Sequence, residues 1–164
     1  MRAIAAFFYR LALALWVGGG ALYTFILTPA IFAAYPRNTA GDIVGTMMPH
    51  YFRLQFAAAG VAALVAVSLW RAWPGRRRAL CLGLLLGALA VQSFVQWGLY
   101  PRILEVKSRV ASFESAPDAP ERQRFRTLHG VSMLLNLTLI AAGTLLLALE
   151  PRREDGSGSA EKGR

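Results

Sequence analysis

Polar side chains that could bind a ligand recur at helical spacing in two otherwise apolar stretches of the chain. Six of them form two rows: Gln92, Gln96, Tyr100, His129, Ser132 and Asn136. Steps of three or four residues place side chains on one face of an α-helix. Polar groups inside a membrane are unfavourable and commonly mark functional sites, so we expect these six residues to line a ligand-binding site.

Two arginines, Arg37 and Arg53, fall near the same predicted end of the molecule as these rows. Arginine at a membrane surface attracts anionic headgroups, so we expect both residues to lie at the mouth of the site. The alternative is that the polar residues only join helices, since interhelical hydrogen bonds in membranes contribute about 0.6 kcal/mol each without any ligand.

Histidine and methionine suggest a second chemistry at this end. His50 and His129 are the two histidines of the chain, and Met133 follows His129 by one helical turn. Paired imidazoles can ligate haem, and imidazole with a thioether suits Cu(I). The sequence therefore leaves open a metal site formed by His50, His129 and Met133, with haem or copper as the cofactor of an oxidoreductase.

Other catalytic arrangements are missing. No carboxylate lies inside an apolar stretch, and Ser132 near His129 has no acidic third member within sequence reach. We assign no catalytic residue, and the pattern favours a non-enzymatic role.

Four uncharged stretches must position these side chains, and they cover 11–34, 54–70, 79–100 and 128–149. A helix needs about 20 mainly apolar residues to cross a bilayer. With 55% hydrophobic residues, the chain is not a soluble enzyme, a secreted disulfide scaffold or a disordered protein. We predict an all-α integral membrane protein, a four-helix transmembrane bundle forming one domain over 1–150, with spans over about 4–34, 51–73, 78–100 and 124–149.

The connections carry their own signals. Thr39 and Asp42 have the spacing of a helix cap, which predicts a short interfacial helix between spans 1 and 2 that ends at Pro49. Asp118, Pro120 and Glu121 predict a new helix start, so spans 3 and 4 should project beyond the bilayer as a helical hairpin. The polar tail over 151–164 is expected to be disordered.

Positive charge predicts the orientation and the partners. The formal net charge is +9, and its arginines flank apolar stretches, which favours lipid headgroups and argues against nucleic acid. Ten basic residues fall on the side of both termini and eight on the other, and a dense cluster at Arg76, Arg77 and Arg78 lies on the first side. We expect both termini in the cytoplasm of a bacterial cell, in its inner membrane, and a possible homodimer through Gly83 and Gly87.

Several motifs resemble those of the transmembrane protein 205-like family. They are the Pro36-Arg37-Asn38-Thr39-Ala40-Gly41, Met48-Pro49-His50-Tyr51-Phe52 and His129-Gly130-Val131-Ser132 strings with Asn136-Leu137, the Trp16-Val17-Gly18-Gly19 string, and Pro101 with Val106, Arg109 and Glu114. The resemblance implies a four-span membrane domain whose animal members are linked with resistance to platinum drugs. It supplies no reaction.

The sequence thus predicts a membrane protein that binds a small polar ligand, a metal species or a partner in the non-cytoplasmic half of the bundle. Tyr51, Phe52 and Trp97 are expected to anchor the interface. The alternatives are the haem- or copper-dependent oxidoreductase using His129 and a structural accessory subunit of a membrane complex.

Overall fold

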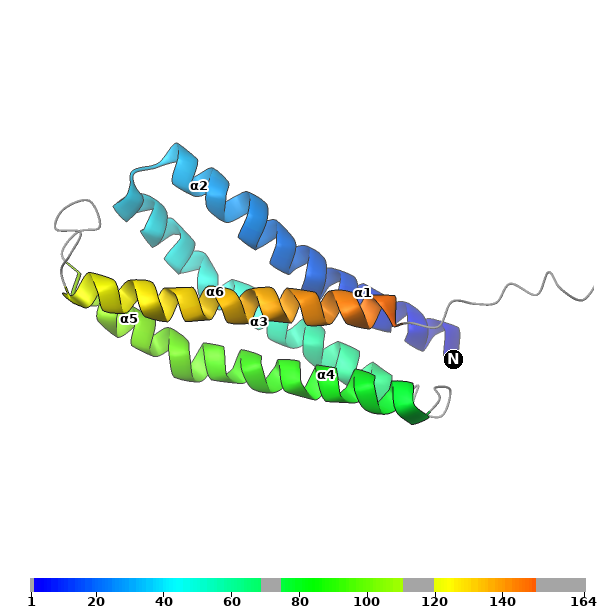
Figure 1. The fold of residues 1–164 in the computed structure, drawn as a ribbon. Coiled ribbons are helices and arrows are strands. Elements are labelled where there is room, and N and C mark those ends of the chain that lie inside the picture. The colour runs from blue at the N-terminus through cyan, green and yellow to red at the C-terminus, as the bar shows by residue number, and fades with distance from the viewer. Residues whose placement is uncertain (1, 69–74, 111–119, 150–164) are drawn as a thin grey trace, which may run out of the picture.

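The computed structural model describes residues 2–68, 75–110 and 120–149, and the regular elements in these ranges are all helical. The elements are α1 (Arg2–Ala21), the π-helix η1 (Leu22–Leu27), α2 (Thr28–Ala34), α3 (Arg37–Ser68), α4 (Gly75–Ser93), the π-helix η3 (Phe94–Leu99), α5 (Tyr100–Ser108) and α6 (Pro120–Ala148). They build four rods that run up and down beside one another (Figure 1). Rod 1 is α1, η1 and α2; rod 2 is α3; rod 3 is α4, η3 and α5; rod 4 is α6.

All four rods are long and apolar enough to cross a membrane. Their outward faces carry many large apolar side chains, such as Phe7, Phe25, Leu64, Leu86 and Leu134, each more than half exposed. Exposed apolar surface on this scale requires a lipid environment, since a soluble protein rarely shows it. The predicted all-α four-helix membrane bundle is therefore confirmed.

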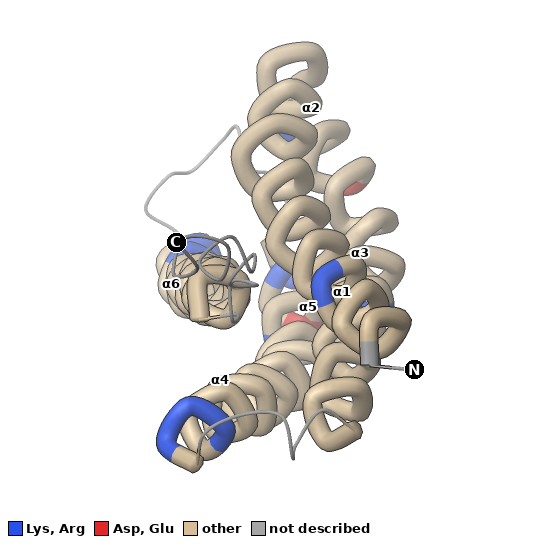
Figure 2. Tube along the Cα trace, turned by 90° about the vertical axis from the view of Figure 1, so that its right-hand side faces the viewer, with Lys and Arg blue, Asp and Glu red and all other residues tan. Residues whose placement is uncertain are grey.

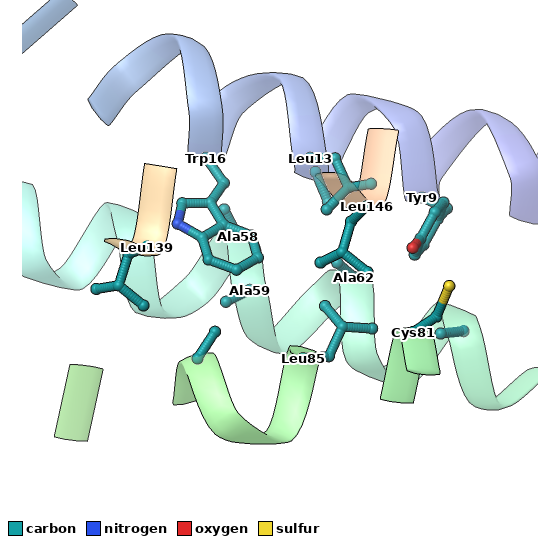
Figure 3. Close-up of a cluster of buried hydrophobic side chains, with 13 residues drawn as sticks. Tyr9, Leu13, Trp16, Ala58, Ala59, Ala62, Cys81, Leu85, Leu139 and Leu146 are labelled. Atoms are coloured by element: carbon teal, nitrogen blue, oxygen red, sulfur yellow. The ribbon is translucent and has the colours of Figure 1, made fainter. Parts of the chain in front are cut away.

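One end of the bundle, which we call the termini end, has a tightly packed core (Figure 3). The start of α1, the start of α4 and the end of α6 meet there (Figure 1), and the basic first turn of α4 stands out in Figure 2. Small side chains of α3 face larger ones of the other rods: Ala58, Ala59, Ala62 and Ala66 lie against Tyr9, Leu13, Trp16, Leu85 and Leu146. Small residues allow helices to approach closely where lipid gives no hydrophobic drive for association.

Rods 1 and 3 each contain a π-helical segment directly before a proline. The N–H of Thr28 donates to the Tyr23 carbonyl, and the N–H of Tyr100 donates to the Val95 carbonyl, five residues back in each case. Proline lacks an N–H and its ring crowds the preceding turn, so a wider turn lets each rod continue through Pro29 or Pro101.

The predicted short interfacial helix between spans 1 and 2 does not exist as a separate element. α3 (Arg37–Ser68) runs without a break and contains Pro49 in its interior. The N–H of Ala40 donates to the Pro36 carbonyl at 2.8 Å, so the helix begins before Thr39, which is not its cap. A single proline removes one backbone donor, and this loss is too small to separate the two segments.

The other rods also extend past the predicted spans. Rod 3 runs over Gly75–Ser108 and rod 4 begins at Pro120, so both continue into the two arms of the predicted hairpin. The predicted cap at Asp118, the end of the predicted second span over 69–73 and the tail over 151–164 lie outside the described residues.

The rods separate at the end opposite the termini end, which we call the far end. There α2 with the start of α3 stands apart from α5 with the start of α6 (Figure 1). α2 packs on α3 and α5 packs on α6, so each hairpin stays paired while the two hairpins diverge. This divergence positions the side chains described next.

Candidate functional site

A cavity of about 400 Å³ lies between the diverging hairpins at the far end, and all four rods contribute to its wall. Its residues repeat at helical spacing on rods 3 and 4: Gln92, Gln96, Tyr100, Ile103 and Lys107 on rod 3, and Arg122, Arg126, His129, Ser132, Asn136 and Leu139 on rod 4. Each row is one face of a helix, so the cavity extends along the rods.

A chain of hydrogen bonds closes the inner part of the cavity between rods 1, 2 and 4. The Tyr51 hydroxyl donates to Oδ1 of Asn136, and Nδ2 of Asn136 donates to Oγ1 of Thr24 at 2.8 Å. The Tyr23 ring stacks on the Tyr51 ring with centroids 4.4 Å apart, and its hydroxyl donates to the Val44 carbonyl at 3.1 Å. The stacking and the hydrogen bonds restrict both tyrosine rings, so this wall is preorganised.

Backbone carbonyls of α3 provide the second set of contacts across the cavity. Pro49 has no N–H, so the Gly45 carbonyl lacks its helical donor, and the Tyr100 hydroxyl of rod 3 donates to it at 3.2 Å. One turn earlier, Nζ of Lys107 donates to the Gly41 carbonyl at 3.1 Å. These two contacts tie rod 3 to the part of α3 that precedes its proline.

The inner end of the cavity holds two glutamines from different rods in contrasting states. Gln55 is buried, and its Nε2 donates to the Trp16 carbonyl at 3.1 Å. Gln92 is only 6% exposed, and within the described part of the chain neither its Nε2 nor its Oε1 has a hydrogen-bond partner. Oε1 of Gln96 is also buried without a hydrogen-bond partner among the described residues. Buried polar groups are normally satisfied, so these amide atoms require an explanation.

The outer end of the cavity, which we call the cationic mouth, is formed by Arg37, Lys107, Arg122 and Arg126. They come from the first turn of α3, the last turns of α5 and the first turns of α6. Nζ of Lys107 also lies 2.8 Å from Oδ1 of Asp42, whose side chain is 74% exposed. None of the described residues that line the cavity is Asp or Glu.

Seven of the eight residues predicted to bind a ligand line this one cavity: Arg37, Gln92, Gln96, Tyr100, His129, Ser132 and Asn136. Arg53 does not line it and is exposed on α3. Tyr51 and Phe52, predicted as interface anchors, instead line the cavity, whereas Trp97 is exposed and packs edge-on against Phe56.

The residues predicted for a metal site are only partly brought together. His129 and Met133 line the cavity, and the imidazole stacks on Phe125 with ring centroids 5.6 Å apart. His50 is exposed and does not line it. Across the described ranges, no group of three or more His, Cys, Asp and Glu side chains is arranged to hold a metal ion.

Tyr23, Lys107, Arg122 and Arg126 line the cavity although the sequence was not interpreted that way. The signal was available for the last three. Lys107 continues the row of Gln92, Gln96 and Tyr100, and the two arginines continue the row of His129 toward the start of its helix. Both rows were ended too early because these charged residues were assigned to the membrane surface and the extramembrane hairpin, and not to the polar faces that they continue.

Fold and cavity together define a multi-pass integral membrane protein with a largely apolar cavity in one half, to which several polar side chains contribute. Residues 11–112 match the family described as Domain of unknown function (DUF4149), and the chain belongs to this family. It is similar to an "Uncharacterized protein" of Aquifex aeolicus (strain VF5), 31% identical over 149 residues that make up 87% of this chain and 98% of that protein. No solved structure matches the chain.

Proposed function

We propose that this protein binds a small ligand in the far-end cavity through a polar group that the ligand places at Gln92. The observation that carries the proposal is the buried amide of Gln92, with neither its donor nor its acceptor satisfied by the described residues. An unsatisfied buried polar group costs about 1–3 kcal/mol, so a ligand that satisfies it gains that energy on binding.

The geometry favours a ligand group that both donates and accepts hydrogen bonds, such as a hydroxyl or an amide. Gln92 offers Nε2 as a donor and Oε1 as an acceptor, and Oε1 of Gln96 adds a second acceptor. Asn136 is already engaged on both sides by Tyr51 and Thr24, so it shapes the wall.

A metal species or a haem group at His129 is the alternative ligand for the same cavity, and it would make the protein an oxidoreductase. An organic ligand with a polar group at Gln92 is better supported, because His50 lies outside the cavity while three amide atoms without a hydrogen-bond partner among the described residues lie inside it. An absorption spectrum and elemental analysis of the purified protein distinguish the two, and a Soret band or bound copper would favour the alternative.

The test of ligand binding is recovery of the natural ligand from protein purified in a mild detergent. Organic extracts of the wild type, Gln92→Leu and Thr138→Val are compared by mass spectrometry. Thr138 is exposed on α6 and bonds within its own helix, so its variant is the control. We expect a molecule that the wild type and the control carry and that Gln92→Leu loses by about tenfold. Equal recovery from all three proteins, or none from the wild type, would overturn the proposal.

We further propose that the protein resides in the bacterial inner membrane with both termini in the cytoplasm, and that the resemblance to the transmembrane protein 205-like family reflects common descent. A homodimer through Gly83 and Gly87 is supported by their open surroundings, since a Cβ at either would meet nothing within 4 Å. Loss of cross-linked dimer in Gly87→Leu would support this interface, and unchanged cross-linking would contradict it. A structural accessory subunit becomes the better description if no ligand co-purifies while a larger complex does.

A further inference from the structure

We infer that the ligand is an anionic amphiphile, with a phosphate or carboxylate headgroup bound at the cationic mouth and an apolar body inside the cavity that carries the polar group bound at Gln92. The inference rests on the proposed function, because it assigns a chemical class to the molecule held at Gln92. It concerns the opposite end of the same cavity and depends on different residues.

Charge at the mouth is the first support. Four cationic side chains from three helices, Arg37, Lys107, Arg122 and Arg126, line one opening, and no acidic side chain among the described residues lines it with them. The ion pair between Lys107 and Asp42 neutralises one positive charge from outside the cavity wall. Arg37 and Arg126 place two guanidinium groups at the opening. Guanidinium groups bind phosphate and carboxylate through paired hydrogen bonds.

The length and the lining of the cavity are the second support. Lys107 and Gln92 are fifteen residues apart on rod 3, which corresponds to about 22 Å along a helix. Apolar and aromatic side chains line the distance between them: Val44, Phe52, Val95, Ile103, Leu104 and Phe125. A free inorganic anion would occupy the mouth alone, whereas an amphiphile with a polar group toward the far end of its apolar body matches the charged end, the apolar middle and the amide end together.

Access from the bilayer is the third support. Phe32 of α2 and Met133 of α6 both line the cavity, and they are 45% and 49% exposed. At this end α2 stands apart from α6 (Figure 1). Apolar side chains at a lateral opening suit a ligand that moves in from the lipid, and the cations at the helix ends then lie where headgroups lie.

The experiment measures binding of three probes to purified protein in a neutral detergent, by native mass spectrometry and by the shift in melting temperature. Ricinoleoyl lysophosphatidic acid has an anionic headgroup and a hydroxyl on its chain, ricinoleoyl lysophosphatidylcholine has the same chain with a zwitterionic headgroup, and inorganic phosphate has no chain. We expect the first lysolipid to bind about tenfold more tightly than the second, and its affinity to fall as salt is raised. Inorganic phosphate should produce no shift at concentrations that saturate the lysolipid.

Arg126→Gln and Arg124→Gln form a matched pair for this test. Both residues are exposed arginines in the first turns of α6, but only Arg126 lines the cavity. Arg126→Gln should weaken lysophosphatidic acid binding by about five- to tenfold, while Arg124→Gln should leave it unchanged. The melting temperature without ligand verifies that both variants fold.

Equal affinity for the two lysolipids, equal losses in the two variants, or binding of inorganic phosphate as tight as that of the lysolipid would each overturn the inference. Its failure is distinguishable from failure of the proposed function. If Gln92→Leu loses the co-purified molecule while Arg126→Gln keeps it, the inference fails and the proposed function holds. If Arg126→Gln loses the co-purified molecule while Gln92→Leu keeps it, the anion site at the cationic mouth is supported and the proposed role of Gln92 fails.

Discussion

At the scale of single residues, Gln55 and Gln92 show how burial and hydrogen bonding separate a structural polar group from a candidate binding group. Both are at most 6% exposed and both line the cavity. Gln55 is satisfied by the Trp16 carbonyl and therefore joins rods 1 and 2. Gln92 is satisfied by nothing within the described ranges, so the fold alone gives no reason for an amide at this position.

This contrast predicts stability changes of opposite sign. Gln92→Leu should raise the free energy of unfolding by about 1 kcal/mol, because it replaces an unsatisfied amide by an apolar group of similar size. Gln55→Leu should lower it by about 0.5–1 kcal/mol through loss of the bond to Trp16. Unfolding in mixed micelles of a neutral detergent with dodecyl sulfate measures both changes on ligand-free protein. A destabilised Gln92→Leu variant would mean that the amide has a structural partner after all.

The sequence predicted much of the site at this scale, because helical spacing alone gathers Gln92, Gln96 and Tyr100 on one face. It could not predict the placement of Arg53 or Tyr51. Both lie within one turn of α3, and which of them faces the other rods depends on the rotation of that helix. Packing against neighbouring rods sets this rotation, and the local pattern does not encode it.

At the scale of helices, the three prolines inside the rods are accommodated in two different ways. Pro29 and Pro101 each follow a π-helical segment, which supplies the wider turn within the rod itself. Pro49 has no such segment, and the carbonyl that it leaves without a donor, that of Gly45, is bound by the Tyr100 hydroxyl. The integrity of α3 at the cavity is thus coupled to rod 3.

A double-mutant cycle tests this coupling. Tyr100→Phe should destabilise the protein by about 1 kcal/mol, because it removes the hydroxyl and keeps the edge-on contact with Phe52. In the Pro49→Ala background the backbone N–H of residue 49 satisfies the Gly45 carbonyl, so the same substitution should have an effect close to zero. Equal effects in the two backgrounds, measured by unfolding in mixed micelles, would show that Tyr100 does not replace the missing donor.

Gly143 and Gly83 provide a test of close packing between rods. A Cβ at Gly143 would lie 2.7 Å from Cγ2 of Val17 and 3.5 Å from the Trp16 ring, whereas a Cβ at Gly83 would meet nothing within 4 Å. Gly143→Ala should therefore destabilise the protein by about 1–2 kcal/mol, since valine has little rotamer freedom in a helix. In the detergent-solubilised monomer, Gly83→Ala should be neutral or stabilising by up to about 1 kcal/mol, because alanine favours a helix over glycine. A similar effect of the two substitutions on unfolding would contradict this difference in packing.

Helix existence was predictable from the sequence, and helix boundaries were not. The uncharged stretches identified four rods, but the rods continue through charged residues such as Arg37, Lys107 and Arg122. Charge content marks where a helix leaves the hydrocarbon, and it does not mark where the hydrogen-bonded helix ends. The sequence placed only one of the four residues of the cationic mouth at the site, because the charged residues of the predicted hairpin were not recognised as parts of the polar rows.

At the scale of the whole molecule, the two ends of the bundle differ in packing, and this difference makes the membrane orientation a functional question. The termini end is filled by alanine, leucine and tryptophan side chains, while the far end holds the cavity and its polar groups. The proposed ligand would therefore be exchanged at one side of the bilayer, and the orientation decides which leaflet that is.

Cysteine labelling settles the orientation, starting from a Cys81→Ala background in which the buried native thiol is removed. Ser108→Cys places a thiol at the exposed end of α5 on the far side, and Gly75→Cys places one at the exposed start of α4 on the side of the termini. Ten basic residues lie on the termini side and eight on the other, so we expect the termini side to face the cytoplasm. A membrane-impermeant maleimide should then label Ser108→Cys in intact cells with a permeable outer barrier. It should label Gly75→Cys only after lysis. Both substitutions preserve the count of basic residues, so they leave the cause of the orientation unchanged. The reverse pattern would place the cationic mouth in the cytoplasmic leaflet, where anionic lipids would be its nearest ligands.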